Sequence, residues 1–242
     1  DATADSPGDG LLQHSRALLR WLDDVQARHP QLLIENCASG AMRMDYAMMA
    51  RLHMQSTSDQ QDPVMYAPIA AAAPASLLPE QAGNWAYPQA GMDSELFTFS
   101  LCNAILGRMY LSGYLNRMSE RELSAVREAV AAQRTVLENI ETSHAVWPLG
   151  LPGWEGGWVA LGLRTDAGSR PGMHLTLWRR PGSDDRVVLS LPVYRDRELE
   201  VDAFFPRQQH GWSWTWDAAA AELTVTAAVP APSARVLFIH TP

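Results

Sequence analysis

The sequence has 242 residues, of which 47% are hydrophobic and 19% charged, which is typical of a globular chain with one large or two small domains. Its formal net charge of -8 argues against nucleic acid and anionic membranes as partners, because both bind clustered positive charge. Cys37 lies in a polar segment and Cys102 in an apolar one, so we expect no disulfide framework.

Several kinds of site are also excluded. The chain has no lysine, so it cannot contain a phosphate loop of the G-x-x-x-x-G-K type. Its histidines show no metal-binding spacing, and we predict no metal and no cofactor. There is no long apolar run and no basic-then-apolar leader, which predicts a cytoplasmic chain without a membrane span. A signal further upstream stays open if this chain is the carboxyl-terminal portion of a longer product.

Helix and strand alternate in the first part of the chain. Apolar residues at helical spacing predict a helix over 11–28, ended by Pro30, and a strand at about 32–36. An amphipathic segment at 45–51 leads to a second strand-like run at 52–54. Because both strand-like runs end in small and polar residues, they predict consecutive βα units of a parallel fold.

Turn and capping residues place the next elements. Asp62 and Pro63 form a typical helix start, and Pro68 and Pro74 predict that this helix is irregular. A short strand or an active-site loop is expected at 79–88.

Two more helices and a strand complete this part of the chain. Ser94 is expected to cap one helix, a strand follows at 109–112, and Ser119 with Glu122 forms a capping box for the next helix. Four strand and helix repeats in about 145 residues make half of an eight-stranded barrel. We therefore predict that residues 1–148 form the carboxyl-terminal half of a (β/α)8 TIM barrel.

The remaining chain predicts an all-β domain. From Trp158 onward, short β-type runs alternate apolar and polar side chains between turns such as Pro181-Gly182. This predicts an antiparallel β-sandwich over residues 149–242, and a fold class of α/β plus all-β. Trp212-Ser213-Trp214-Thr215-Trp216 places three indoles on one face of a strand. For these rings we favour the interface between barrel and sandwich over a carbohydrate-binding platform.

A composite pattern lies between residues 35 and 62. In chain order it consists of Cys37, a loop of small residues, the Arg-x-Asp of Arg43 and Asp45, and Thr57-Ser58-Asp59. With this pattern the chain resembles the acid/base region of glycoside hydrolase family thirty-six, the bacterial α-galactosidase family. The resemblance implies a retaining glycoside hydrolase that releases terminal α-linked galactose-type residues from oligosaccharides, with Asp59 as general acid/base. Asp59 could instead cap the following helix.

The resemblance also implies a set of substrate-binding residues. Cys37 would contact the sugar rather than act as a nucleophile, because no base partner lies near it in the sequence. Arg43 would bind sugar hydroxyls or orient a carboxylate. The other substrate-binding residues that we expect are Ser39, Gly40, Asp62 and Trp85. Asp62 is more readily explained as a helix cap, and a tryptophan such as Trp85 is more often a core residue than a stacking face.

Two departures from the family pattern leave the exact sugar open. Residues 38–42 read Ala-Ser-Gly-Ala-Met where the family has a glycine-rich loop, and Ser56 stands where a tryptophan is common. The sugar could be galactose, N-acetylgalactosamine or another α-linked residue.

The second carboxylate of a retaining glycosidase is missing. It must lie about 5 Å from the acid/base. In the family it belongs to a Lys-x-Asp motif on an earlier strand, which a chain without lysine cannot contain. We therefore expect this chain to be inactive alone, with two partners: the amino-terminal half of the same enzyme and an α-galactoside oligosaccharide. We expect the enzyme to be a homo-oligomer. A transglycosylase on the same scaffold and a non-catalytic carbohydrate-binding or structural fragment are the alternatives.

Overall fold

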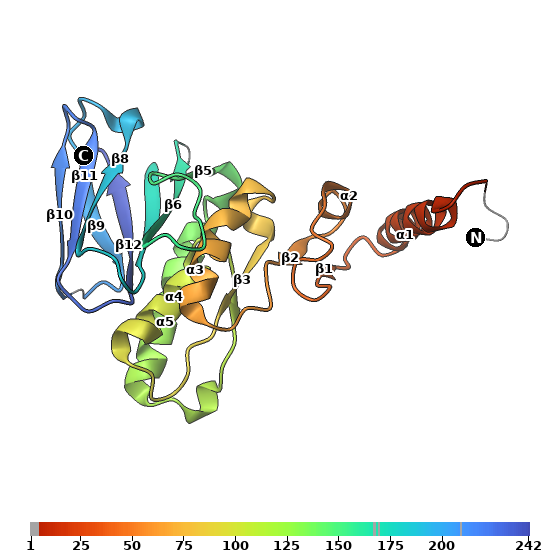
Figure 1. The fold of residues 1–242 in the computed structure, drawn as a ribbon, viewed down its shortest axis with the longest axis horizontal. Helices are drawn as coiled ribbons and strands as arrows, with labels where there is room; N and C mark the ends of the chain where they lie inside the picture. Colours follow the sequence, from red (N-terminus) through yellow and green to blue (C-terminus); the bar gives the residue numbers. More distant parts are fainter. Residues whose placement is uncertain (1–4, 167, 169, 209) are drawn as a thin grey trace. The chain divides into compact units, whose positions relative to one another are not determined.

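The computed structural model describes residues 5–166, 168, 170–208 and 210–242. Internal contacts divide the chain into two compact units, Asp1–Ser56 and Thr57–Pro242 (Figure 1). The domain boundary predicted between residues 148 and 149 lies inside the second unit and stays a prediction. In the described part of the chain, no helix combines the length and the apolarity that crossing a membrane requires.

The first unit contains two helices and two short strands. They are α1 (Asp9–Arg28), β1 (Glu35–Asn36), α2 (Tyr46–Met49) and β2 (Met54–Ser56). Strands β1 and β2 pair in parallel, with Glu35 opposite Met54, which confirms the predicted parallel arrangement. Strand β1 is shorter than predicted: Leu32 and Leu33 precede it and are exposed.

The second unit begins with helices and parallel strands in alternation. These are α3 (Pro63–Ala72), β3 (Ala82–Ala86), α4 (Ser94–Ile105), β4 (Arg108–Leu111) and α5 (Glu120–Leu137). Single 3-10 turns lie at Ala73–Ala75, Pro79–Gln81, Leu115–Arg117 and Ile140–Thr142. Strands β3 and β4 pair in parallel. Pro68 lies inside α3, and a 3-10 turn follows that helix directly, as the two prolines predicted.

Local capping chemistry explains where these helices begin. The predicted capping box of α5 is present, because Ser119 and Glu122 bond each other's backbone N–H groups. Helix α4 differs slightly from the prediction: its N-cap is Asp93, whose carboxylate accepts from the N–H groups of Glu95 and Leu96, and Ser94 is the first helical residue. Both residue types cap helices well, so the sequence alone does not separate the two positions.

Two antiparallel sheets complete the second unit. The five-stranded sheet has the order β5-β6-β7-β12-β9 and the three-stranded sheet the order β10-β11-β8. Their strands are β5 (His144–Val146), β6 (Trp158–Thr165), β7 (Gly172–Arg179), β8 (Arg186–Ser190), β9 (Glu200–Phe205), β10 (Trp212–Asp217), β11 (Glu222–Ala227) and β12 (Ser233–His240). A 3-10 turn lies at Pro192–Tyr194. The predicted antiparallel pairing in this part of the chain is confirmed.

The helices form a layer between the β3–β4 pair and the five-stranded sheet (Figure 1). Helix α4 lies in the middle of this layer and contacts β3, β4 and β12 as well as its neighbours α3 and α5. Every residue from Phe99 to Ile105 is buried. One apolar core therefore extends from the parallel strands through the helices to the antiparallel sheet, and includes Phe99, Ile105, Trp178 and Val236.

A second core lies between the two antiparallel sheets, and it contains the tryptophans of β10. Trp212 is a member of this core, and Trp214 and Trp216 pack against it. The last two donate indole hydrogen bonds to the carbonyls of Val201 and Arg197, at 3.0 and 2.9 Å. The predicted place of these rings between barrel and sandwich is therefore wrong. Alternation along a strand identified their common face, but not that β10 belongs to the three-stranded sheet, with its rings in the core between the two antiparallel sheets.

His174 on β7 gives a testable consequence of this packing. Its ring centroid lies 4.5 Å from that of Phe204 and 4.7 Å from that of Phe238. Burial, with a smaller contribution from the charge of Arg170, lowers the pKa of His174 to about 4. An unfolded histidine binds its proton near pH 6.5, so the unfolded state gains protons first as the pH falls.

The free energy of unfolding should therefore decrease as the pH is lowered from about 6.5 towards 4, and His174 alone should account for about 3 kcal/mol of that decrease. Urea unfolding of the protein and of a His174→Leu variant at pH 7 and pH 4.5 tests this, since carboxylates that titrate over the same range contribute equally to both proteins. The variant should lose less stability between the two pH values. An identical loss in both would contradict the prediction.

Candidate active site

The Thr-Ser-Asp triplet begins with a buried anchor. Thr57 is 5% exposed, and its backbone N–H donates to the carbonyl of Gly83 on β3 at 3.2 Å. The Thr57 hydroxyl donates to the same carbonyl at 3.0 Å, lies 3.2 Å from Asn84 Oδ1 and bonds the hydroxyl of Tyr66 on α3. These bonds fix the first residue of the triplet to β3 and to α3.

The rest of the loop is stabilised by its own side chains. Ser58 Oγ accepts from the N–H of Gln60 at 3.1 Å, and Gln60 Oε1 accepts from the N–H of Asp62 at 2.9 Å. Asp62 is the N-cap of α3, because its Oδ1 accepts from the N–H groups of Val64 and Met65. The predicted capping role of Asp62 is confirmed, and the helix therefore does not need Asp59 as a cap.

Asp59 is exposed, as are Gln61 and Asp62 of the same loop. Among the hydrogen bonds of the described residues, none involves its side chain. A general acid must reach the glycosidic oxygen of a substrate, so its carboxylate oxygens should not be engaged in hydrogen bonds with helix N–H groups. The loop therefore combines a rigid base with an accessible carboxylate.

Three aromatic rings lie beside this loop on the β3–β4 pair. Trp85 stacks on Tyr87 with centroids 5.4 Å apart and planes at 10°, and Tyr110 of β4 meets Trp85 edge-on at 5.0 Å. Gly83 makes room for the Tyr110 ring, because a Cβ at this position would lie 2.5 Å from it. Ala86, which alternates with Trp85 along β3, faces the helix layer, so the rings lie on the opposite face of the strands. Trp85 is half-buried there.

In the first unit, the loop after β1 is shaped by side-chain amides. Asn36 Nδ2 donates to the carbonyl of Arg43 at 2.9 Å and to Gln55 Oε1 at 2.5 Å, and Gln55 Nε2 donates to the carbonyl of Gly40 at 3.3 Å. Ser39 and Gly40 both have positive φ, 45° and 72°, a conformation that favours glycine. The amides thus hold a tight loop between β1 and α2.

This loop exposes three of the predicted substrate-binding side chains, Cys37, Ser39 and Arg43, whereas Gly40 is buried. Asp45 caps α2 by accepting from the N–H of Met48 at 2.9 Å. Within the described residues, the hydrogen bonds of Arg43 use its backbone carbonyl, and its guanidinium makes none to Asp45.

The predicted site residues thus fall into two groups. Cys37, Ser39, Gly40 and Arg43 belong to the first unit, and Asp59, Asp62 and Trp85 to the second. Their convergence around one sugar stays a prediction. The sequence did not indicate Tyr66, Gly83 or Tyr110, because their contacts depend on the orientation of α3 and on the register of β3 with β4.

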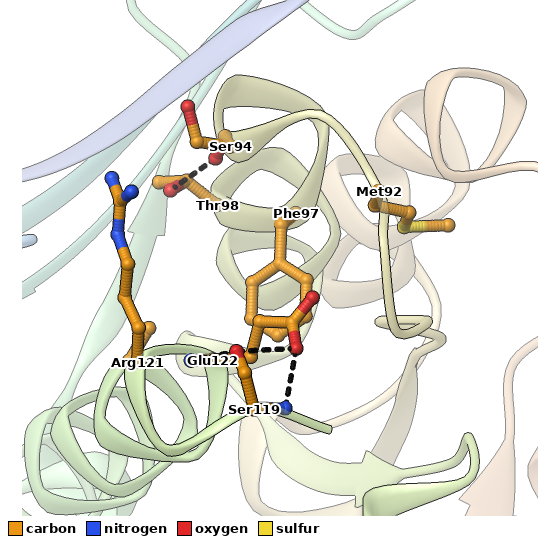
Figure 2. A pocket seen from close by; sticks show the side chains of 8 residues that line it. Met92, Ser94, Phe97, Thr98, Ser119, Arg121 and Glu122 are labelled. Atoms are coloured by element: carbon orange, nitrogen blue, oxygen red, sulfur yellow. Dashed lines mark hydrogen bonds between the residues drawn. The ribbon is translucent and has the colours of Figure 1, made fainter. Parts of the chain in front are cut away.

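Figure 2 shows a separate pocket of about 290 Å³ between the first turns of α4 and α5. Glu122 dominates it: its carboxylate accepts from the N–H of Gly91 at 2.8 Å and from the N–H and hydroxyl of Ser119 at 2.6 and 2.7 Å. The bond from Gly91, followed by those from Ser119, lowers the pKa of Glu122. Because a carboxylate of the chain already occupies these donors, we do not place a substrate here. No group of three or more potential metal ligands occurs among the described residues.

Comparison with known proteins identifies close structural neighbours. Residues 10–142 match the sequence profile of the Melibiase family. A variant of the glycoside hydrolase family thirty-six α-galactosidase AgaA from Geobacillus stearothermophilus, solved with raffinose, has a TM-score of 0.72 at 16% identity, over 92% of this chain and 30% of that chain. The α-galactosidase from Lactobacillus brevis gives 0.70 at 14% identity, over 92% and 31%. The galactosidase domain of the α-galactosidase-sucrose kinase AgaSK gives 0.71 at 14% identity, also over 92% and 31%.

At these identities the likeness to the solved structures concerns the fold. The chain spans about three tenths of the length of these neighbours. A search of curated proteins finds no match.

Proposed function

The chain belongs to the Melibiase family, within glycoside hydrolase family thirty-six, and from this we propose that it supplies the general acid/base of a retaining α-galactosidase. The observation that carries the proposal is the loop of Thr57-Ser58-Asp59. It follows directly on a strand of a parallel pair, its first residue is bonded to β3, and Asp59 is exposed. The carboxyl end of such a strand is the usual place of catalytic side chains in (β/α)8 enzymes.

The chemistry assigned to Asp59 has two steps. As an acid it protonates the glycosidic oxygen while an aspartate nucleophile attacks the anomeric carbon from the opposite face. As a base it then takes a proton from the water that hydrolyses the galactosyl-enzyme. The nucleophile is a residue upstream of this chain, which has no Lys-x-Asp motif.

The substrate is a terminal α-linked galactose of an oligosaccharide. Variants of one structural neighbour, AgaA, were solved with raffinose and with stachyose, which supports this class of sugar. Cys37, Ser39, Gly40 and Arg43 would contact the sugar from one loop, and Asp62 and Trp85 from the other unit.

In this proposal the active site is shared between this chain and an upstream half of the barrel. The parallel strands and their helices would form half of a (β/α)8 barrel, with the rings of Trp85, Tyr87 and Tyr110 on the inner face. The upstream half would complete that barrel in a cytoplasmic homo-oligomer.

A direct test compares this chain alone with the longer enzyme that also contains the upstream half. The chain alone should not release nitrophenol from p-nitrophenyl α-galactoside above background, because acid catalysis without a nucleophile forms no galactosyl-enzyme. The longer enzyme should do so, and proton NMR of the first product should show α-galactose, which means retention. Sustained turnover by this chain alone, or β-galactose as the first product, would overturn the proposal.

A further inference from the structure

Tyr66 links the two ends of the segment that contains Asp59. It is 1% exposed on α3, and its hydroxyl accepts from the backbone N–H of Trp85 at 2.9 Å while it bonds the hydroxyl of Thr57. Thr57 in turn lies 3.0 Å from the carbonyl of Gly83. Four groups from β3, α3 and the loop therefore form one chain of hydrogen bonds.

The two ends of this hydrogen-bond chain have fixed roles. The N–H of Trp85 can only donate, and the carbonyl of Gly83 can only accept. When Thr57 donates its proton to the carbonyl of Gly83, Tyr66 donates its own to Thr57. In a buried chain of this kind each bond polarises the next, and the loss of the Tyr66 hydroxyl removes one bond from the N–H of Trp85 and one from the hydroxyl of Thr57.

Tyr66 itself does not titrate during catalysis. Burial raises the pKa of Tyr66 to about 12, against which the bonds to Thr57 and Trp85 act only partly. The phenol therefore stays protonated and keeps its donor role at every pH at which a galactosidase works.

We infer that Tyr66 is a positioning residue for Asp59: its hydroxyl closes the loop of residues 57–66 against β3 and so fixes where the acid/base carboxylate stands. The inference rests on the proposed function of Asp59. Without the hydroxyl, Thr57 would lose its direct bond to the N-terminal turn of α3. A displacement of about 1 Å at a catalytic group can reduce a rate about 100-fold.

The experiment uses Tyr66→Phe in the complete enzyme, with Tyr194→Phe as the matched control. Tyr194 is also a buried tyrosine, in the antiparallel part of the unit, but its hydroxyl bonds no described residue. We expect Tyr66→Phe to lower kcat/KM about 10-fold or more for methyl α-galactoside, and less than about 3-fold for 2,4-dinitrophenyl α-galactoside, whose leaving group needs little protonation. Tyr194→Phe should change neither value.

Thr57 provides a second, independent pair of variants. Thr57→Val removes the hydroxyl from the same chain and should show the same leaving-group dependence, whereas Thr57→Ser keeps the hydroxyl and should behave like the parent enzyme. The double variant Thr57→Val with Tyr66→Phe should lose little more than either single variant, because both break one chain.

An equal loss for both substrates in Tyr66→Phe, or independent losses in the double variant, would overturn the inference. An Asp59→Asn enzyme measured in parallel separates this outcome from a failure of the proposed function. If Asp59→Asn shows the leaving-group dependence and Tyr66→Phe does not, only the inference fails. If neither shows it, Asp59 is not the acid.

Hydrogen exchange on this chain tests the same contact without catalysis. Tyr66→Phe should accelerate amide exchange in residues 57–62 about 10-fold, because it removes a bond that closes the loop. Tyr194→Phe should leave exchange in this segment unchanged. Unchanged exchange of residues 57–62 in Tyr66→Phe would contradict the inference even for an inactive preparation.

Discussion

Replacing Asp59 by alanine in the complete enzyme is expected to slow formation of the galactosyl-enzyme about 100- to 10,000-fold for alkyl galactosides, which is the range of general acid catalysis. The same change should have a much smaller effect on 2,4-dinitrophenyl α-galactoside, because its leaving group departs without a proton. Pre-steady-state measurements of the first step with both substrates give the comparison.

The matched control is Asp93→Asn. Asp93 is also an exposed aspartate next to a helix start, but it caps α4, and asparagine can take over that role. The Asp93→Asn enzyme should form the galactosyl-enzyme at rates near those of the parent enzyme with both substrates. Similar losses for both substrates in Asp59→Ala would show that the carboxylate is not the acid.

A large loss of stability is expected when the partner of Arg235 is removed. Arg235 on β12 is 2% exposed, and its guanidinium bonds both carboxylate oxygens of Glu95 on α4 at 2.8 Å. Glu95→Ala would leave a buried cation without its counter-charge. The free energy of unfolding should decrease by about 3 to 5 kcal/mol, as measured by urea denaturation.

Two further variants test whether the loss of stability comes from an unpaired buried charge. Glu120→Ala breaks the exposed pair of Glu120 with Arg127 and should change stability little, because solvent screens it. Replacing both members of the buried pair, by Glu95→Leu with Arg235→Met, should restore much of the loss, since no unpaired charge remains. A Glu95→Ala protein as stable as its parent would show that water reaches Arg235.

The features that the sequence predicted well depend on neighbours along the chain. The capping box of Ser119 and Glu122 and the start of α3 at Asp62 follow from residues two or three positions apart. The contacts that it missed depend on three-dimensional placement. The bond between Tyr66 and Thr57 requires α3 to turn back over the loop, and the space above Gly83 depends on which residue of β4 lies beside it.

In the candidate site, too, the sequence predicted features of the chain but not contacts that depend on the fold. The order and spacing of Cys37, Arg43 and Asp59 identified the family, because a motif is a property of the chain. The support behind Asp59 could not be read in the same way, since it consists of backbone groups of β3 and a hydroxyl of α3. The tryptophans of β10 show what the sequence pattern does not predict. Their common face on the strand was evident, but not the core in which that face is buried.

The central position of α4 has a consequence for recombination between relatives. Most of this helix has no side towards solvent, because β3 and β4 cover one face and β12 covers the other. A chimera that takes the parallel strands from one family member and the antiparallel sheets from another would force α4 to fit two surfaces that had not evolved together. Such exchanges should succeed only when α4 and β12 are transferred as a pair.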